Sequence, residues 1–163
     1  MSIVVSDTSP IRALDHIGCL PLLVDFFGRV LIPVAVAREL AAPRRDFRAI
    51  QVADHPFLEV IDATDRGRVD DLRKSLDLGE AEAIALACEV NADAILIDER
   101  RGRAAAGRFG LTIIGTMGLL VRAKREQKIA AVRPLLDALM DELEFFVAAD
   151  LRIEILRQAG ETP

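Results

Sequence analysis

Acidic side chains lie at positions in this sequence where several of them can meet. Asp7 closes the segment Ile-Val-Val-Ser-Asp at residues 3–7, and Asp98 and Glu99 close Ala-Ile-Leu-Ile-Asp-Glu at residues 94–99. Carboxylates gathered in one crevice repel one another unless a cation neutralises them. Mg²⁺ or Mn²⁺ does so with hard oxygen ligands and keeps water in its coordination shell. The pattern therefore favours metal-assisted chemistry in which a metal-bound water is the nucleophile.

Further acids lie at the starts or on the faces of predicted helices. Glu39 occurs in Val-Ala-Arg-Glu-Leu, and Glu80 and Glu82 occur in Gly-Glu-Ala-Glu-Ala. Each acid also has a purely structural interpretation. Asp7 and Asp98 could cap the helices that follow them, and Glu39 could be a solvated helix residue. Glu80 and Glu82 lie in a first helical turn, where the helix dipole favours acids in any case.

Other catalytic devices have little support in the sequence. The two histidines, His16 and His55, have no matching partners for a Ser-His-Asp or Cys-His arrangement. The two cysteines, Cys19 and Cys88, lack the spacing of a structural zinc site. Neither a Walker A loop nor a Gly-x-Gly-x-x-Gly dinucleotide motif is present.

Short apolar segments alternate with amphipathic ones along the chain. Residues 3–5, 29–32, 57–61, 94–97 and 111–114 are predicted strands, and helices are predicted between them, including a short one over 46–54. Residues 145–147 are a candidate late edge strand. Alternation of this kind is typical of an α/β fold with a parallel sheet covered by helices. Such sheets gather their functional residues at the carboxyl ends of the strands, where Asp7 and Asp98 are expected.

The composition suits one folded domain over residues 1–163, with residues from about 160 onward expected to be frayed. The chain has 163 residues, of which 52% are hydrophobic. Because no basic leader or long apolar segment is present, we expect a cytoplasmic protein without a membrane segment.

Charge and aromatic content limit how this chain could bind a nucleic acid. The net charge is −5, so binding would depend on a local basic patch rather than on bulk charge. Seven Phe are the only aromatic residues apart from histidine, which argues against a base-stacking platform. Between residues 100 and 128 there are eight basic residues and one acid. The predicted substrate-binding residues come from this stretch: Arg100, Arg101, Arg103 and Lys124.

A second basic cluster and a glycine-flanked turn add to this interpretation. Arg44, Arg45 and Arg48 could form another rim beside an acidic centre, although both basic clusters could equally be solvated surface. Thr116 lies in Gly-Thr-Met-Gly after the fifth predicted strand. It could belong to a simple tight turn, or its hydroxyl and neighbouring N–H groups could hold a phosphate or a water.

Four segments of the chain together resemble the PIN-domain family, most closely its VapC-like branch. They are Asp-Thr-Ser-Pro at 7–10, Gly-Glu-Ala-Glu-Ala-Ile at 79–84, Ile-Asp-Glu-Arg-Arg-Gly-Arg at 97–103 and Gly-Thr-Met-Gly at 115–118. They occur in the family's order and span nearly the whole chain. The resemblance implies a PIN-like three-layer sandwich with a five-stranded parallel sheet, in order 3-2-1-4-5, flanked by helices.

The same resemblance implies a function and a set of site residues. The protein is expected to be an endoribonuclease that depends on Mg²⁺ or Mn²⁺, acting as the toxin of a toxin–antitoxin pair with a small antitoxin partner and forming a homodimer. The family's catalytic acids correspond to Asp7, Glu39, Glu80 and Asp98, with Asp7, Glu80 and Asp98 as metal ligands. The supporting polar residues are Ser9, Thr116, Glu82 and Glu99, and Thr8 is a rival to Ser9.

Two departures from the family pattern leave an alternative open. Many relatives carry Asp where this chain has Glu80, and Glu82 competes for the same role. Many also carry Thr or Ser at the position of Leu96. The alternative is a PIN-like module with weak or absent catalysis that binds RNA or a protein partner. A phosphoacceptor receiver domain fits less well, since Asp7 stands alone and no lysine accompanies Thr116.

Overall fold

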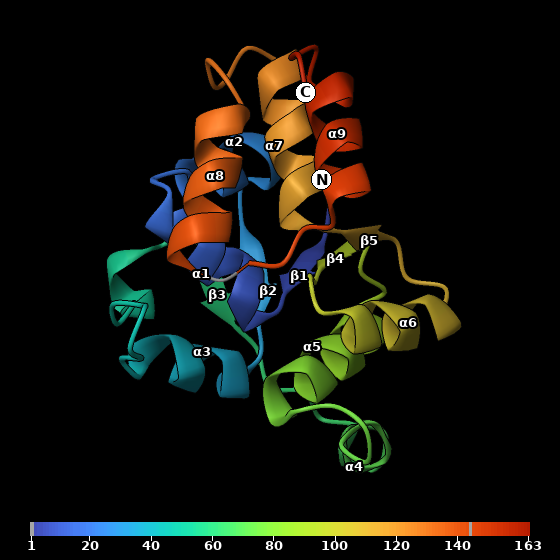
Figure 1. Cartoon of the computed structure of the whole chain (residues 1–163). Coiled ribbons are helices and arrows are strands. Elements are labelled where there is room, and N and C mark those ends of the chain that lie inside the picture. Colours follow the sequence, from blue (N-terminus) through green and yellow to red (C-terminus); the bar gives the residue numbers. More distant parts are fainter. Residues whose placement is uncertain (1, 144) are drawn as a thin grey trace.

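Five short strands form one parallel sheet at the centre of the protein. The computed structural model describes residues 2–143 and 145–163. The strand order is β3-β2-β1-β4-β5, and every neighbouring pair is parallel (Figure 1). The strands are β1 (Val4–Ser6), β2 (Val30–Ile32), β3 (Leu58–Val60), β4 (Ala94–Leu96) and β5 (Ile113–Ile114). The predicted α/β class, strand segments and strand order are confirmed.

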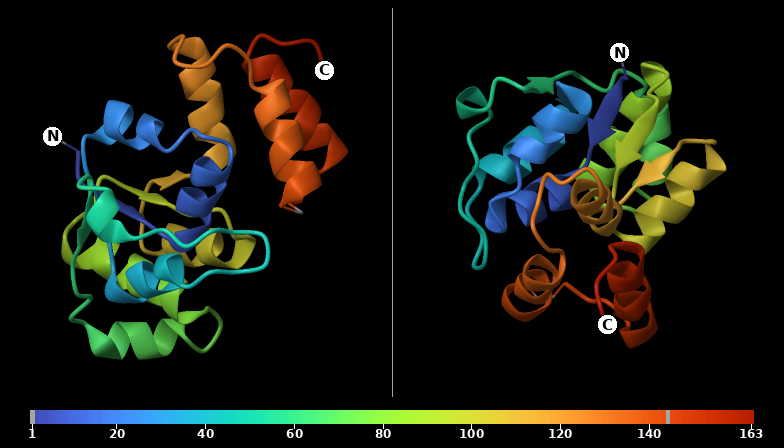
Figure 2. Two further views of the ribbon diagram at one scale, coloured as in Figure 1. Left: turned by 90° about the vertical axis from the view of Figure 1, so that its left-hand side faces the viewer. Right: turned by 90° about the horizontal axis from the view of Figure 1, so that it is seen from above.

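Helices cover both faces of this sheet. They are α1 (Thr8–His16), α2 (Pro21–Phe27), α3 (Val34–Ala41), α4 (Arg66–Leu72), α5 (Leu78–Glu89), α6 (Arg100–Arg108), α7 (Thr116–Arg125), α8 (Arg133–Glu142) and α9 (Ala149–Gln158). Figure 1 shows α1, α2 and α7 on one side of the strands and α5 and α6 on the other. In both views of Figure 2, α8 and α9 lie beyond α7 at one end of the molecule.

Two hydrophobic cores result from the pleat of the strands. Successive side chains of a strand point to opposite faces of the sheet. In β1, Val4 joins the core that includes Leu14 of α1 and Leu120 of α7. The next residue, Val5, joins the core that includes Ile84 of α5. Because both faces are covered, the strands are apolar on both sides, as the sequence indicated.

Helix α5 is enclosed on all sides. It packs against α3, α4, α6 and β1, and the nine consecutive residues Gly79–Ala87 are all buried. A helix surrounded in this way has little solvent face, which explains why it has small and apolar residues on every side. Any polar side chain on its first turns must therefore find a partner or a pocket.

Two predicted elements are corrected by the structure. The segment 46–54 contains only a short 3₁₀ turn, Val52–Asp54, because Arg44 and Phe47 exchange backbone hydrogen bonds of 3.1 Å and close a tight turn before it. Residues 145–147 do not form a strand. The backbone N–H of Phe145 donates to Leu139 in α8, and Val147 is buried in the core, so this segment pairs with helices instead of the sheet.

Near the chain end, Glu161 contacts the start of α8. Its carboxylate accepts hydrogen bonds from the backbone N–H groups of Val132 and Arg133, at 2.6 and 3.1 Å. These bonds cap the start of α8 and tie residue 161 to the core. Within residues 2–143 and 145–163, none of the helices has the length and apolar character needed to cross a membrane.

Candidate active site

Asp7 lies at the carboxyl end of β1, where its backbone N–H donates to Leu96 of β4 at 3.0 Å. The residue is 3% exposed. It occupies the N-cap position of α1, yet its carboxylate makes no capping hydrogen bond to the helix. The capping interpretation therefore does not account for an acid at this buried position.

Five carboxylates surround a pocket of about 340 Å³ at this edge of the sheet. They belong to Asp7, Glu39, Asp77, Glu80 and Glu99. Burial raises the pKa of Asp7 to about 8, with contributions from the negative charges of Asp77, Glu80 and Glu39 and a partial lowering by the N–H of Thr8. Burial followed by the charge of Asp77 likewise raises the pKa of Glu80 to about 7. These acids repel one another in a poorly solvated space, as the sequence argument required.

Glu39 enters the pocket from α3. One of its oxygens, Oε2, accepts the hydroxyl hydrogen of Thr8 at 2.6 Å. Its other oxygen lies so close to the backbone of α5 that a Cβ at Gly79 would come within 2.6 Å of it. A side chain at position 79 would therefore displace the carboxylate of Glu39. Thr8 is the residue that orients this acid, whereas Ser9 lines the pocket beside it.

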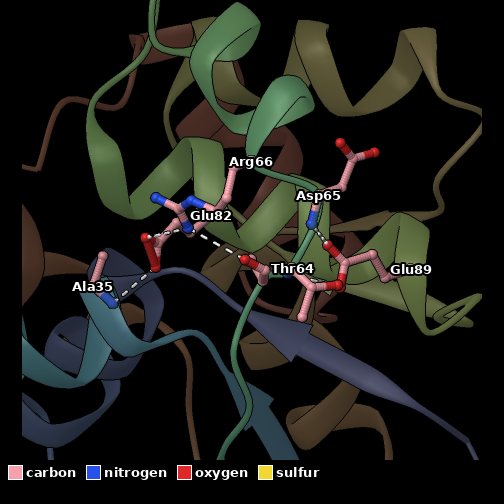
Figure 3. A network of polar contacts seen from close by, with 7 residues as sticks. Ala35, Thr64, Asp65, Arg66, Glu82 and Glu89 are labelled. Carbon is pink, nitrogen blue, oxygen red and sulfur yellow. Dashed lines mark hydrogen bonds and ion pairs between the residues drawn. The ribbon is translucent and has the colours of Figure 1, made fainter.

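Glu80 and Glu82 are both buried but have different partners. Glu80 lines the pocket, and its carboxylate has no ion-pair partner among the described residues. Glu82 accepts the backbone N–H of Ala35 at 3.1 Å and pairs with Arg66 at 3.3 Å (Figure 3). Glu82 thus caps the start of α3. The structure brings Glu80, and not Glu82, to the other acids.

Figure 3 shows that Glu82 belongs to a set of contacts that fastens the β3–α4 connection to α5. Glu89, two turns further along α5, accepts the backbone N–H groups of Thr64 and Asp65 at 3.1 and 2.6 Å. None of these residues lines the acidic pocket. The expectation that Glu82 supports the site is therefore replaced by a structural role at the start of α3.

Asp98 follows β4 but does not line the acidic pocket. It accepts the backbone N–H of Thr116 at 2.8 Å and the Thr116 hydroxyl at 2.6 Å, so it caps α7. A Cβ at Gly115 would lie 2.6 Å from Arg103 and 3.2 Å from Asp98, so only glycine fits there. Burial raises the pKa of Asp98, while Thr116 and Arg103 lower it in part. Asp7 and Asp98 therefore do not line the acidic pocket together, and Thr116 is engaged by Asp98.

The predicted basic residues are distributed unevenly around the site. Arg100 lines two pockets next to the acidic one, and Arg103 lies beside Asp98. Arg101 is exposed on α6 and lines none of these pockets. The structure does not bring Lys124 to the site: it lies at the far end of α7 from Thr116 and pairs with Glu161 at 3.3 Å.

Two residues of the pocket, Asp77 and Arg12, were not singled out from the sequence. Asp77 caps α5 by accepting the N–H of Glu80 at 2.8 Å, and the Asp-x-x-Glu spacing at 77–80 is the capping signature that could have revealed it. Arg12 is buried, donates to the backbone carbonyls of Glu39 and Ala42, and has an Nε atom without a partner in the described residues. Arg44 reaches the same pocket from the 44–47 turn. No local pattern marks Arg12, whereas Arg44 belongs to the second basic cluster predicted from the sequence.

The oxygen ligands that this pocket offers are of the type that a hard divalent cation prefers. Asp7 and Glu80 are carboxylates in a water-poor pocket, and neither has an ion-pair partner among the described residues. Over the described part of the chain, no three acidic, histidine or cysteine side chains stand close enough to enclose one ion. Mg²⁺ commonly takes only one or two carboxylates and retains several waters. Two direct carboxylates, with waters reaching the others, therefore fit this geometry.

Comparison with known proteins agrees with this architecture. A family model described as a PIN domain matches residues 3–161. The chain belongs to the PIN-domain family. PIN domains are generally nucleases that use divalent metals. A search of curated proteins found none that matches this PIN-domain chain.

Proposed function

We propose that this PIN-domain protein is an endoribonuclease that depends on Mg²⁺ or Mn²⁺. The observation that carries the proposal is the pocket in which Asp7, Glu39 and Glu80 meet, with two carboxyls whose pKa values are raised to about 8 and about 7. Buried acids with such pKa values are typical of functional sites. A structural role would have given them hydrogen-bond or ion-pair partners, as Glu82 has.

Asp7 and Glu80 are the residues that would hold the cation, and Glu39 would act through water. When bound, a divalent cation supplies compensation for negative charge and a lower pKa for a coordinated water. Glu39 is oriented by the hydroxyl of Thr8 and by the space over Gly79, so its carboxylate is positioned to accept a proton from water in the pocket. Asp98 fixes the start of α7 and is a positioning residue in this scheme.

Arginines at the rim would hold the phosphates of the substrate. Arg12 and Arg44 line the acidic pocket, and Arg100, at the start of α6, lines the adjoining pocket with them. Guanidinium groups bind phosphate in a bidentate manner, which fixes the position of the strand. This arrangement of basic rims around an acidic centre supports a phosphodiester substrate despite the net charge of −5.

The choice of RNA and the cellular role rest on the sequence motifs. The segments at 7–10, 79–84, 97–103 and 115–118 resemble the VapC-like branch. We therefore include in the proposal a role as the cytoplasmic toxin of a toxin–antitoxin pair, a small antitoxin partner and a homodimer. Sedimentation of the purified chain, with and without the product of a neighbouring small reading frame, tests the homodimer and the antitoxin partner.

The decisive experiment compares two substitutions on the same helix. Glu80→Gln removes a pocket acid, and Glu82→Gln changes a buried acid two residues away that retains its oxygen for Ala35. We expect Glu80→Gln and Asp7→Asn to lower Mn²⁺-dependent cleavage of defined RNAs by at least about 100-fold. Glu82→Gln should cleave at nearly the wild-type rate.

Retained cleavage in Asp7→Asn would refute the proposed site. If the wild type cleaves no RNA, Mn²⁺ binding measured by calorimetry distinguishes a metal-dependent nuclease from a non-catalytic binding module. Uptake of Mn²⁺ that is lost in Asp7→Asn would support a metal-dependent nuclease acting on another substrate. The absence of uptake at millimolar Mn²⁺ would favour the non-catalytic RNA- or protein-binding module.

A further inference from the structure

A second pocket, of about 480 Å³, adjoins the acidic one. The two have four lining residues in common, namely Ser9, Arg12, Arg44 and Glu99. A chain molecule bound through a phosphate at the acids can therefore continue past the shared residues into this second pocket. Its remaining walls come from α1, the 44–47 turn, the start of α6 and the segment between α8 and α9.

Aromatic side chains are concentrated in this second pocket. Three of the seven phenylalanines of the chain, Phe47, Phe145 and Phe146, line it. Phe146 is 89% exposed, the most open large apolar side chain among the described residues. The composition argued against a stacking platform, but the fold gathers the few available rings beside the acids.

Three arginines and two acids, Asp98 and Glu99, line the same pocket, so positive charge is in excess there. Arg12, Arg44 and Arg100 line it, and none of them pairs with a carboxylate in the described part of the chain. The carboxylate of Asp98, which also lines it, is engaged by Thr116. Guanidinium groups without carboxylate partners beside an exposed aromatic ring are a combination with which proteins bind single-stranded nucleic acids.

We propose that this second pocket is a nucleobase subsite in which Phe146 stacks on an unpaired base next to the phosphate held at the acids. The inference rests on the proposed nuclease function. It assigns Phe146 as the residue that would bind the nucleotide next to the scissile phosphate. Arg44 and Arg100 contact the flanking phosphates. A nucleic acid strand fits better than a protein segment, since it supplies the alternating anions and flat rings that the arginines and Phe146 complement.

The test is binding of a fluorescein-labelled octaadenylate to the full chain, measured by anisotropy in EDTA at pH 6 and low salt. Without metal no cleavage occurs, so binding is read separately from the proposed nuclease function. Phe146→Ala should weaken binding by about 5- to 150-fold, the range for loss of one stacked base. Phe146→Trp should bind as well as the wild type or better, and Phe146→Leu, which is apolar but cannot stack, should resemble Phe146→Ala.

Phe109→Ala is the matched control. Phe109 is also an exposed phenylalanine, but it lies under the guanidinium of Arg68 in a pocket between α4 and α6. Its substitution should leave octaadenylate affinity unchanged. Circular dichroism checks that each variant is folded.

Three outcomes would overturn the subsite. They are wild-type affinity in Phe146→Ala, no octaadenylate binding by the wild type, or a change of sedimentation from dimer to monomer in Phe146→Ala with unchanged RNA affinity. The last would identify Phe146 as part of a protein interface. A wild type that binds octaadenylate through Phe146 but cleaves no RNA with Mn²⁺ would contradict the nuclease function and leave the subsite standing.

Discussion

Replacing Asp7 by asparagine should change how the stability of the metal-free protein depends on pH. Burial and neighbouring charges raise the pKa of Asp7 from 3.8 to about 8. The folded protein therefore keeps this proton over a range in which the unfolded chain has already released it. The free energy of unfolding should fall as pH rises from about 4 to 8 and then level off.

The size of this effect follows from the two pKa values. One pKa unit corresponds to about 1.4 kcal/mol. Between pH 5 and pH 9, ionisation of Asp7 should cost the wild type about 4 kcal/mol of unfolding free energy that Asp7→Asn does not lose. Glu80 titrates in both proteins. Subtracting the unfolding free energies of Asp7→Asn from those of the wild type at each pH therefore leaves the contribution of Asp7 and of its interaction with Glu80.

Urea unfolding in EDTA at several values between pH 5 and pH 9 measures the difference directly. A parallel series with Mn²⁺ should restore stability to the wild type above pH 7, by about 2.7 kcal/mol at a metal concentration of 100 times Kd. The Asp7→Asn variant should gain little from Mn²⁺. Asp71→Asn, at an exposed acid that pairs with Lys74, is the control and should follow the wild type.

A difference between wild type and Asp7→Asn that stays flat from pH 5 to pH 9 would refute this reasoning. It would mean that the Asp7 carboxyl is solvated or already compensated, and that the pocket does not concentrate negative charge. Equal stabilisation of both proteins by Mn²⁺ would place the cation elsewhere.

Three further substitutions separate stability from activity. Gly79→Ala should leave the free energy of unfolding unchanged or raise it by up to about 1 kcal/mol, because alanine favours the helix. The cleavage rate should fall, because the new Cβ displaces the carboxylate of Glu39. A variant that loses both thermal stability and cleavage rate would contradict this prediction. Glu82→Ala should cost about 1 to 2 kcal/mol in urea unfolding through loss of the α3 cap, with Mn²⁺ affinity by calorimetry unchanged. Thr116→Val should raise the pKa of Asp98 further in an NMR titration, since a hydrogen bond to the ionised form is lost; an unchanged pKa would argue against the hydroxyl bond.

Much of the fold was predictable because hydrophobic patterns act locally. Segments such as residues 3–5 and 94–97 are apolar on both faces, which marks buried parallel strands. The segments 46–54 and 145–147 were predicted incorrectly. Their conformation depends on contacts that no periodicity reveals, the bridge between Arg44 and Phe47 and the bond from Phe145 to Leu139.

The candidate site was predictable in its location and less so in its membership. Strand ends determine where Asp7 lies, and the Gly-Glu segment determines where Glu80 starts its helix. The orientation of Asp98 was not predictable, because the hydroxyl and the backbone N–H that bind its carboxylate come from Thr116, 18 residues further along the chain. Arg12 could not be found either, since its carbonyl partners come from a different helix.

By itself, the sequence determined the α/β class, the strand order implied by its motifs, and an acidic centre led by Asp7. Tertiary structure alone decided that Glu80 faces the pocket while Glu82 caps α3, and that Phe146 lies open beside the acids. The physical reason is the range of the interactions. Strand and helix formation depends on neighbouring residues, whereas the partner of a buried carboxylate, such as the N–H of Ala35 47 residues from Glu82, is chosen only when distant elements pack together.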